Sequence, residues 1–212
     1  AIAHEIRNPL ASISGSIQLL GSTLELSEDD QRLMEIVSRE TESLNQWITD
    51  FLTYARPRIG EFVQVDLSRL VSDGLLILRG DEKSAKVETS CEAPEACFVN
   101  ADPTYLKQVI WNILNNGVQA MEGGGKLTVS VTSVEDHRGQ FHQVSFQDTG
   151  VGIPDHVKER LFEPFYTTKQ GGTGLGPATA YRIANELGGS ISVESEVGVG
   201  STFVLELPAA LI

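Results

Sequence analysis

Two apolar patterns with a seven-residue period run through the first 56 residues, and they constrain the fold more than any other feature of the sequence. In the first, apolar residues recur in steps of four and three at Ile6, Leu10, Ile13, Ile17, Leu20 and Leu24. In the second, they recur at Leu33, Val37, Leu44, Trp47, Phe51 and Ala55. Such spacing places one apolar stripe along each of two helices. The short polar link ELSEDD between them predicts an antiparallel hairpin.

A single two-helix hairpin cannot bury its own apolar stripes, so this segment needs a partner. Two copies packed side by side would form a four-helix bundle, and residues 1–57 therefore predict a homodimer. The alternative is that the hairpin packs on the rest of its own chain. Ser27 and Asp30 form a plausible capping pair at the start of the second helix, where carboxylates crowd the first turn.

The charge of the chain narrows the class of partner. The 212 residues include 16 Lys+Arg and 29 Asp+Glu, for a formal charge of −13. Such an acidic surface repels phosphate backbones and anionic lipid heads, which argues against binding of nucleic acid or direct contact with a membrane. A local pocket of backbone amides can still hold ATP. No apolar run approaches the roughly 20 residues that span a bilayer.

The chain does not begin with Met, and we expect it to be a fragment of a longer protein that carries a sensor or a membrane anchor upstream. Cys91 and Cys97 form no CxxC motif and have no histidine at ligand spacing, so we expect no structural zinc site. Two ordinary thiols are typical of a reducing compartment, and we expect the fragment to be cytoplasmic.

The sequence AHEIRNPL places a histidine and a carboxylate side by side on the first helix. His4 lies two residues before Ile6, about 200° around the helix, and so points away from the apolar stripe. Asn8 lies one turn later on the same face. A lone exposed histidine usually has no function. With Glu5 beside it and an amide one turn on, His4 is a candidate nucleophile with a base and a water-positioning group.

From residue 62 the pattern changes to short strands, helices and glycine-rich connections, after a probable linker PRIGE at 57–61. We predict strands at 62–65, 86–90, 96–100, 126–134 and 142–148, helices at 67–78, 102–121 and 175–187, and a closing hairpin at 190–207. DHRGQ is expected to form the turn between the fourth and fifth strands. Mostly antiparallel strands gathered with helices indicate an α+β sandwich, a sheet with helices on one face.

Two stretches of this second domain suggest ligand binding. In WNILNNGVQAM, Asn112 and Asn116 lie four residues apart on one helix face, an oxygen-rich patch that suits Mg²⁺. In QDTGVGIP, Asp148 ends a strand and can accept a hydrogen bond from an exocyclic amine. Gly150 and Gly152 can let a flat ring approach the backbone. Taken alone, the asparagine pair fits a solvated helix face better than a metal site, and QDTGVGIP could equally be a tight turn.

Two glycine-rich stretches follow. LFEPFYTTKQGG places Phe162 and Phe165 on either side of a proline, with Lys169 and two glycines after them, which is the composition of a mobile lid. GGTGLGPATA opens a helix whose free amides suit phosphates. This loop does not follow a strand in a βαβ unit, and it lacks GxxxxGK[ST], so it fits neither a Rossmann fold nor a P-loop.

In combination and order, these stretches resemble the motifs of sensor histidine kinases of two-component signalling. AHEIRNPL resembles the H box, NILNNGVQAM the N box, DTGVGIP the G1 box, FEPFYTTK the F box and GTGLG the G2 box, with GVGST as the final glycine turn. The resemblance implies a dimerisation and histidine-phosphotransfer hairpin at 1–57 that forms a dimeric four-helix bundle. It implies a catalytic ATP-binding domain of the Bergerat (GHKL) type at 62–212. The stretches FLTYARP and FEPFYTTK are similar to those of the kinase branch that includes NtrB and PilS.

The resemblance also implies a reaction. His4 would accept the γ-phosphate of ATP, with Glu5 as the neighbouring base, and would pass the phosphoryl group to an aspartate of a response regulator. Asn8 resembles the residue that positions water when such kinases dephosphorylate their partner, so phosphatase activity is implied as well.

The implied cofactors are ATP and Mg²⁺. Asn116 would ligate Mg²⁺, and Asn112 would lie close to the phosphates. Asp148 would accept a hydrogen bond from the adenine amine. Gly150 and Gly152 would lie beside the adenine ring, and Thr202 would lie near the adenine. The phosphates would be held by Lys169 and by the segment of Gly172, Thr173, Gly174, Leu175 and Gly176.

Two departures from the family pattern leave a second reading open. Gly117 stands where alanine usually follows the second asparagine, at a cost of roughly 1 kcal/mol in helix propensity. Pro177 stands where leucine usually follows GLG; proline is tolerated in the first turn of a helix but removes one amide. The alternative is therefore a nucleotide-binding dimeric signalling scaffold with weak kinase activity. A clamp ATPase of the same superfamily is disfavoured by the His-Glu pair on a heptad hairpin.

Overall fold

The computed structural model describes residues 9, 11–13, 15–17, 19–21, 27–55, 60–94, 96–169 and 172–210. The chain divides into two compact units, residues 1–57 and 58–212. None of the helices within the described ranges is both long enough and apolar enough to cross a lipid bilayer.

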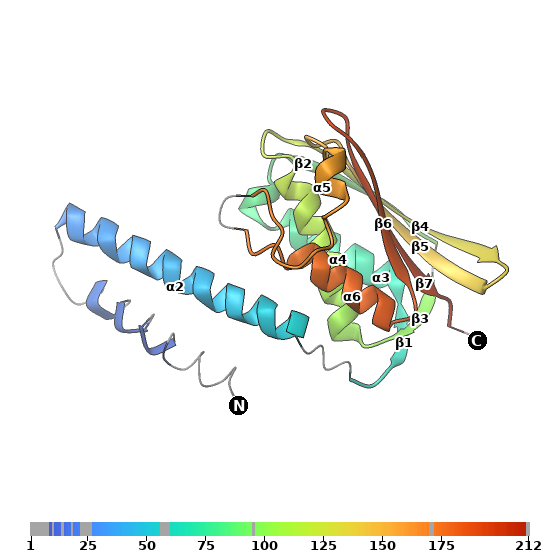
Figure 1. Cartoon of the computed structure of the whole chain (residues 1–212), viewed down its shortest axis with the longest axis horizontal. Helices are drawn as coiled ribbons and strands as arrows, with labels where there is room; N and C mark the ends of the chain where they lie inside the picture. The colour runs from blue at the N-terminus through green and yellow to red at the C-terminus, as the bar shows by residue number, and fades with distance from the viewer. Residues whose placement is uncertain are drawn as a thin grey trace. The chain divides into compact units, whose positions relative to one another are not determined.

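The N-terminal unit consists of the two helical segments of a hairpin (Figure 1). Residues 11–13, 15–17 and 19–21 are helical, and α2 spans Glu28–Ala55. The predicted cap of α2 is confirmed: the Asp30 amide donates to Ser27 Oγ at 3.2 Å, and the Ser27 hydroxyl donates to the Asp30 carboxylate at 2.6 Å. Acidic side chains at Glu28, Asp29 and Asp30 also suit the positive end of the helix dipole.

A five-stranded sheet forms the framework of the C-terminal unit, with the strand order β2-β4-β5-β7-β6. Its strands are β2 (Val87–Glu92), β4 (Gly125–Asp136), β5 (Gly139–Asp148), β6 (Ser190–Glu196) and β7 (Gly200–Pro208). Strands β2 and β4 pair in parallel, and the other neighbours pair antiparallel. A separate antiparallel pair joins β1 (Val63–Asp66) to β3 (Phe98–Ala101).

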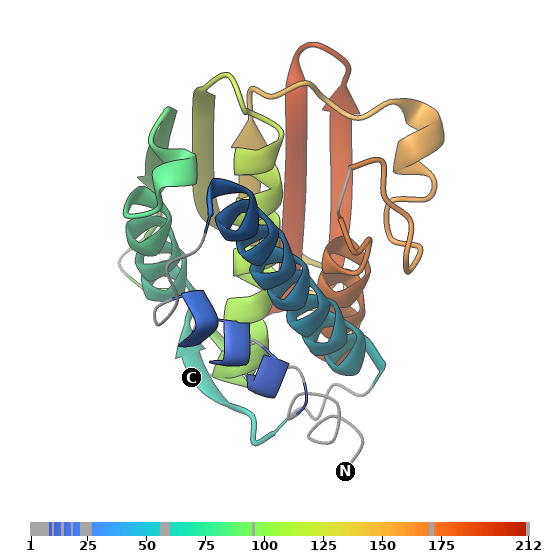
Figure 2. The ribbon, with the colours of Figure 1, turned by 90° about the vertical axis from the view of Figure 1, so that its left-hand side faces the viewer.

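Three helices cover one face of this sheet, as Figure 2 shows. They are α3 (Leu67–Arg79), α4 (Pro103–Gln119) and α6 (Gly176–Glu186), and two shorter elements are the 3₁₀ turn at Glu82–Ser84 and α5 (Asp155–Lys158). The predicted α+β sandwich is therefore confirmed, and each predicted strand and helix of this unit is present with ends shifted by a few residues.

Strict alternation along the strands creates the core under these helices. On β7, Ser201, Phe203, Leu205 and Leu207 are buried while the residues between them are half-buried. The same face carries Leu127, Val129 and Val131 of β4 and Val144 and Phe146 of β5. Helix α4 meets them with Leu106, Val109, Ile110, Ile113 and Leu114, a spacing that gives one apolar helix face. This packing fixes α4 on the sheet.

The N-terminus of α4 is held by a buried carboxylate. Asp102 accepts hydrogen bonds from the amides of Thr104 at 2.8 Å and Gly60 at 2.7 Å. These backbone hydrogen bonds outweigh the opposing effect of desolvation and lower the pKa of Asp102. Pro103 occupies the first turn of the helix, where its missing amide costs no intrahelical bond. Asp102 thus ties the start of α4 to the segment that enters this unit.

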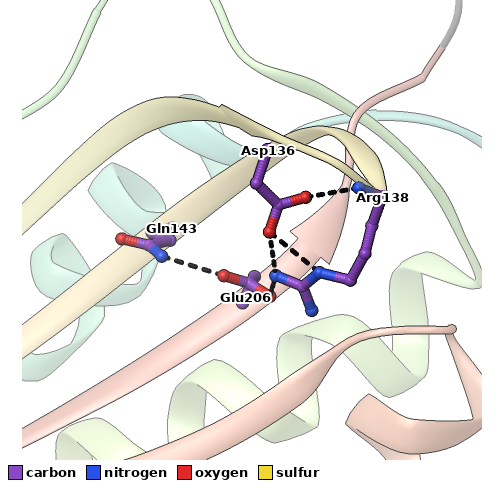
Figure 3. Close-up of polar contacts among 4 residues, drawn as sticks. All are labelled: Asp136, Arg138, Gln143 and Glu206. Atoms are coloured by element: carbon purple, nitrogen blue, oxygen red, sulfur yellow. Dashed lines mark hydrogen bonds and ion pairs between the residues drawn. The ribbon is translucent and has the colours of Figure 1, made fainter.

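The hairpin between β4 and β5 is tighter than the sequence predicted. The turn shrinks to His137 and Arg138, because Asp136 already pairs with Gly139. Figure 3 shows the reason: the Arg138 guanidinium lies 2.7 Å from Asp136 Oδ2 and 2.8 Å from Glu206 Oε1 on β7. The guanidinium also stacks 4.5 Å from the ring centre of Phe141. Polar residues that looked like a loop therefore extend the strands.

Candidate active site

One face of α4 carries three amide side chains that point to the loops around the start of α6. Asn112, Asn116 and Gln119 occupy positions i, i+4 and i+7, which share a helix face. Asn112 Nδ2 donates to the Gly176 carbonyl at 3.3 Å. Asn116 Oδ1 and Gln119 Oε1 accept from Lys169 Nζ at 3.3 Å and 2.6 Å. The two asparagines predicted from the sequence thus contact both glycine-rich stretches.

Asp148 lies at the end of β5 and is 4% exposed, and a Cβ on Gly117 of α4 would lie 3.8 Å from its own Cβ. Its Oδ1 accepts hydrogen bonds from the amides of Gly150 at 2.8 Å and Ser201 at 3.3 Å, and Oδ2 takes neither of these donors. Burial raises the pKa of Asp148, against the lowering effect of those two amides and of the Lys169 ammonium. The site therefore holds a buried carboxylate whose environment favours a hydrogen-bond donor or a positive charge.

The glycines beside Asp148 are required by packing within the chain. A Cβ on Gly150 would lie 2.5 Å from the carbonyl oxygen of Ala120, at the end of α4. A Cβ on Gly152, whose φ is +70°, would overlap the carbonyl oxygen of Glu196. The Val151 amide donates a hydrogen bond to the Ala120 carbonyl at 3.1 Å, and the Val151 carbonyl accepts one from the Gly198 amide at 2.9 Å. The G1-like loop is thus clamped between α4 and the β6–β7 turn.

Thr202, which the sequence analysis placed near the adenine, does not share the face of Asp148. It pairs with Gln147, and because side chains alternate along a strand its Cβ lies on the opposite face of the sheet. The residue opposite Asp148 is Ser201, which is 3% exposed and donates its amide to the carboxylate. Ser201, and not Thr202, therefore shares the face of Asp148.

The lid between α5 and α6 is closed at its base by a main-chain hydrogen bond, in which the Phe165 amide donates to the Gly174 carbonyl at 3.1 Å. A Cβ on Gly174, with φ +65°, would lie 2.5 Å from the carbonyl carbon of Phe165. Phe162 stacks on Tyr181 of α6 with ring centres 4.8 Å apart. Of the two aromatic residues on either side of Pro164, Phe162 thus packs on α6, while Phe165 is 60% exposed.

The start of α6 has the features of a phosphate-binding helix end. Pro177 lies in its first turn, as predicted, and Leu175 is buried. The Leu175 amide donates to Thr173 Oγ1 at 3.2 Å, and the Gly172 amide donates to the Lys169 carbonyl at 3.2 Å. Within the part of the chain that the structure describes, the amides of Gly174 and Gly176 donate to no protein acceptor. Free amides of this kind suit an anion.

His4, Glu5 and Asn8 lie outside the described residues. The structure adds two residues that the sequence analysis missed, Gln119 and Ser201. Gln119 could have been found from its position seven residues after Asn112, and Ser201 from the two-residue alternation of its strand.

Comparisons with known proteins agree with this architecture. The pattern of the family described as "Histidine kinase-, DNA gyrase B-, and HSP90-like ATPase" matches residues 101–211, and that of the "His Kinase A (phospho-acceptor) domain" matches residues 1–60. The signal transduction histidine-protein kinase AtoS of Escherichia coli (strain K12) is 38% identical over 208 residues, which cover 98% of this chain and 34% of AtoS. The chain thus spans about a third of that relative.

Two solved structures extend the comparison. Full-length ShkA in complex with AMPPNP superimposes with a TM-score of 0.83 at 25% identity, over 100% of this chain and 45% of ShkA. The histidine kinase ThkA in complex with the response regulator protein TrrA superimposes with a TM-score of 0.71 at 28% identity, over 99% of this chain and 60% of ThkA.

The assignment to the branch of NtrB and PilS stays a prediction. With an ATPase pattern over more than half of its length and a phospho-acceptor domain before it, the chain belongs to the histidine kinase-, DNA gyrase B- and HSP90-like ATPase family, within its sensor histidine kinases.

Proposed function

We propose that this chain is the catalytic core of a sensor histidine kinase that transfers the γ-phosphate of ATP to His4 and then to an aspartate of a response regulator. The observation that carries the proposal is the convergence of three separate segments. Helix α4 contacts the start of α6 through Asn112–Gly176 and the lid through Asn116–Lys169, and its end contacts the loop after Asp148 through Ala120–Val151.

ATP fits the chemistry of this site. The Asp148 carboxylate would accept a hydrogen bond from the adenine amine, with the loop of Gly150 and Gly152 holding it in place. The segment Gly172–Gly176 and Lys169 would hold the phosphates, since the Gly174 and Gly176 amides are free among the described residues and the Lys169 side chain is a cation. The AMPPNP bound to ShkA, onto part of which this whole chain superimposes, supports this assignment.

Mg²⁺ also fits the residues present. Asn116 Oδ1 and Gln119 Oε1 converge on a cation, the Lys169 ammonium, so this patch is already arranged around positive charge. Amide oxygens are suitable ligands for Mg²⁺, and we assign Asn116 as the residue that would hold it. Bound Mg²⁺ supplies charge neutralisation on the phosphates, which is the main requirement of phosphoryl transfer.

The roles of His4 and Glu5 rest on the phospho-acceptor match over residues 1–60. A neutral imidazole is abundant near pH 7, because the ordinary pKa of histidine is about 6.5. The imidazole would attack the γ-phosphate, and Glu5 would hold or remove the proton on the other ring nitrogen. We assign this core to the cytoplasm, where ATP is available.

A second copy of the chain is the partner we assign to the N-terminal hairpin. The apolar heptad residues of α2 are exposed within a single chain, from 44% for Val37 to 59% for Leu33. Leu44, Trp47 and Phe51 are each 48% exposed on the same stripe. Pairing two such stripes in a four-helix bundle buries them. We assign residues 1–57 as the dimerisation and phosphotransfer domain and residues 62–212 as the ATP-binding domain.

The second partner we assign is a receiver domain of a response regulator, as in the complex of ThkA with TrrA. We further assign a phosphatase activity toward that partner to Asn8. Asn8→Ala is expected to preserve labelling of the kinase by ATP while slowing dephosphorylation of a phosphorylated receiver domain. An unchanged dephosphorylation rate would remove Asn8 from this role.

The ATP site is tested by incubating the purified chain with Mg²⁺ and γ-labelled ATP. The wild type should gain protein-bound label, whereas Asn116→Ala and Asp148→Asn should lose most of it. Gln140→Met is a matched control, because it alters an exposed glutamine at the opposite end of β5 from Asp148. Equal labelling of all four proteins would show that phosphate transfer does not use this site.

A further inference from the structure

Lys169 connects the lid to α4 through a single ammonium group shared between two neutral oxygens. Its Nζ donates to Gln119 Oε1 at 2.6 Å and to Asn116 Oδ1 at 3.3 Å. The shorter distance marks Gln119 as the stronger acceptor, because a charge-assisted hydrogen bond is strongest below about 2.9 Å. Asn116 is the weaker of the two acceptors.

The other end of Lys169 is fixed within the lid. Its amide donates to Thr167 Oγ1 at 3.1 Å, and its carbonyl accepts from the Gly172 amide at 3.2 Å. The backbone of Lys169 is therefore held on both sides, and only the side chain needs to move when the ammonium changes partner. Gln119 lies one helical turn after Asn116, within reach of the same ammonium.

Asn116 cannot serve the ammonium and a divalent cation at once. The two positive charges would lie a few ångströms apart and repel, and they would compete for the same amide oxygen. A residue that draws the ammonium away from Asn116 without losing it from the site would remove this conflict. Gln119 has the position and the acceptor for that task.

We propose that Gln119 is a positioning residue that holds the Lys169 ammonium off Asn116 and so frees the Asn116 oxygen for Mg²⁺ when Mg–ATP binds. The inference rests on the proposed ATP site. It predicts that the chemistry of residue 119 sets how much Mg²⁺ the protein needs for nucleotide binding, although residue 119 itself does not ligate the metal.

The test measures ATP affinity over a series of free Mg²⁺ concentrations and reports the half-saturating value. Gln119→Met removes the acceptor at similar volume, leaves Asn116 as the acceptor for the ammonium, and should raise the half-saturating Mg²⁺ about fivefold, the size of one net hydrogen bond. Gln119→Glu holds the ammonium more strongly and should lower the half-saturating Mg²⁺ concentration. Gln140→Met, at an exposed glutamine on the hairpin end of β5, is the matched control and should leave the half-saturating Mg²⁺ unchanged. Opposite shifts from two replacements at one exposed position do not arise from a general loss of structure.

The same two replacements at Gln119, made in a Lys169→Met protein, show whether residue 119 affects Mg²⁺ through Lys169 or by binding the metal directly. In Lys169→Met, both replacements at Gln119 should change the half-saturating Mg²⁺ by less than about twofold, because sites that act through one shared partner are not additive. A shift by Gln119→Glu in that background would show that residue 119 binds the cation itself, and this would overturn the inference.

The two proposals fail differently. A wild-type protein that binds no ATP at any Mg²⁺ concentration contradicts the proposed function and the inference with it. A wild type that binds Mg–ATP, together with Gln119 variants that match it at every Mg²⁺ concentration, overturns the inference alone.

Discussion

Replacing Asp148 by asparagine should separate the stability of the C-terminal unit from its affinity for ATP. Both backbone amides that bond to this side chain, those of Gly150 and Ser201, donate to Oδ1. An asparagine in the same rotamer keeps that oxygen, so both hydrogen bonds survive. The change is confined to the second position, where an amide donor replaces Oδ2.

The loss in affinity follows from this geometry. A carboxylate that accepts from the adenine amine contributes about 1.5–3 kcal/mol, the usual value for a hydrogen bond with a charged partner. Asparagine presents a donor to a donor, so ATP affinity should fall roughly 10- to 150-fold, since each 1.4 kcal/mol is a factor of ten. Titration calorimetry with ATP measures the affinities of the wild type and of Asp148→Asn.

The free energy of unfolding of Asp148→Asn should rise relative to that of wild type, whereas its ATP affinity falls. Burial raises the pKa of Asp148 above its ordinary 3.8, so the folded protein binds this proton more tightly than the unfolded chain. Between 3.8 and the raised value, the wild type therefore loses stability as the pH rises, and the loss is complete above that window. Asp148→Asn lacks this loss, so its free energy of unfolding relative to wild type should increase from acid to neutral pH.

Urea unfolding of both proteins across this pH range provides the assay. A variant that is clearly less stable than wild type at pH 7 would show that the buried carboxylate is net stabilising, and the reasoning on desolvation would be wrong. A variant with unchanged ATP affinity would exclude Asp148 from adenine binding.

Three further substitutions test the packing of two glycines near the site and the effect of the missing amide at Pro177. Gly152→Ala should destabilise the protein by more than about 2 kcal/mol in urea unfolding, because its Cβ would overlap the Glu196 carbonyl at a left-handed φ. Gly123→Ala, with open space around it, is the matched control and should change little; equal effects would refute the clash. Gly117→Ala should stabilise by about 0.5 kcal/mol, since the gain in helix propensity exceeds a small shift of Leu127, whose Cδ1 would lie 3.2 Å from the new Cβ. A loss above about 1 kcal/mol would mean that Leu127 cannot move. Pro177→Leu restores one free amide in the first turn of α6 and should raise ATP affinity about fivefold in equilibrium binding. Unchanged affinity would place that amide away from the phosphates.

Local patterns predicted most of the elements and part of the site. The four-residue spacing of Asn112 and Asn116 indicated one helix face, and that face does contact Lys169 and Gly176. Patterns of this kind depend only on the geometry of one helix or strand. The same reasoning, carried one step further, would have found Gln119 and Ser201.

Local sequence patterns could not predict the contacts between distant segments. Nothing local indicates that β2 pairs in parallel with β4, 38 residues further on at Ser90 and Thr128. The role of Gly152 is equally non-local, because the atom that excludes a side chain there belongs to Glu196. The short turn at His137 and Arg138 depends on Glu206, far along the chain on β7.

The position of the label after reaction with γ-labelled ATP tests the account most directly. Purified wild type and His4→Gln are incubated with Mg²⁺ and γ-labelled ATP, and the protein-bound label is then treated with acid and with base. The account predicts label on the wild type that is acid-labile and base-stable, and none on His4→Gln. Label that persists in His4→Gln, or a wild type that binds ATP and takes up no label, would contradict it.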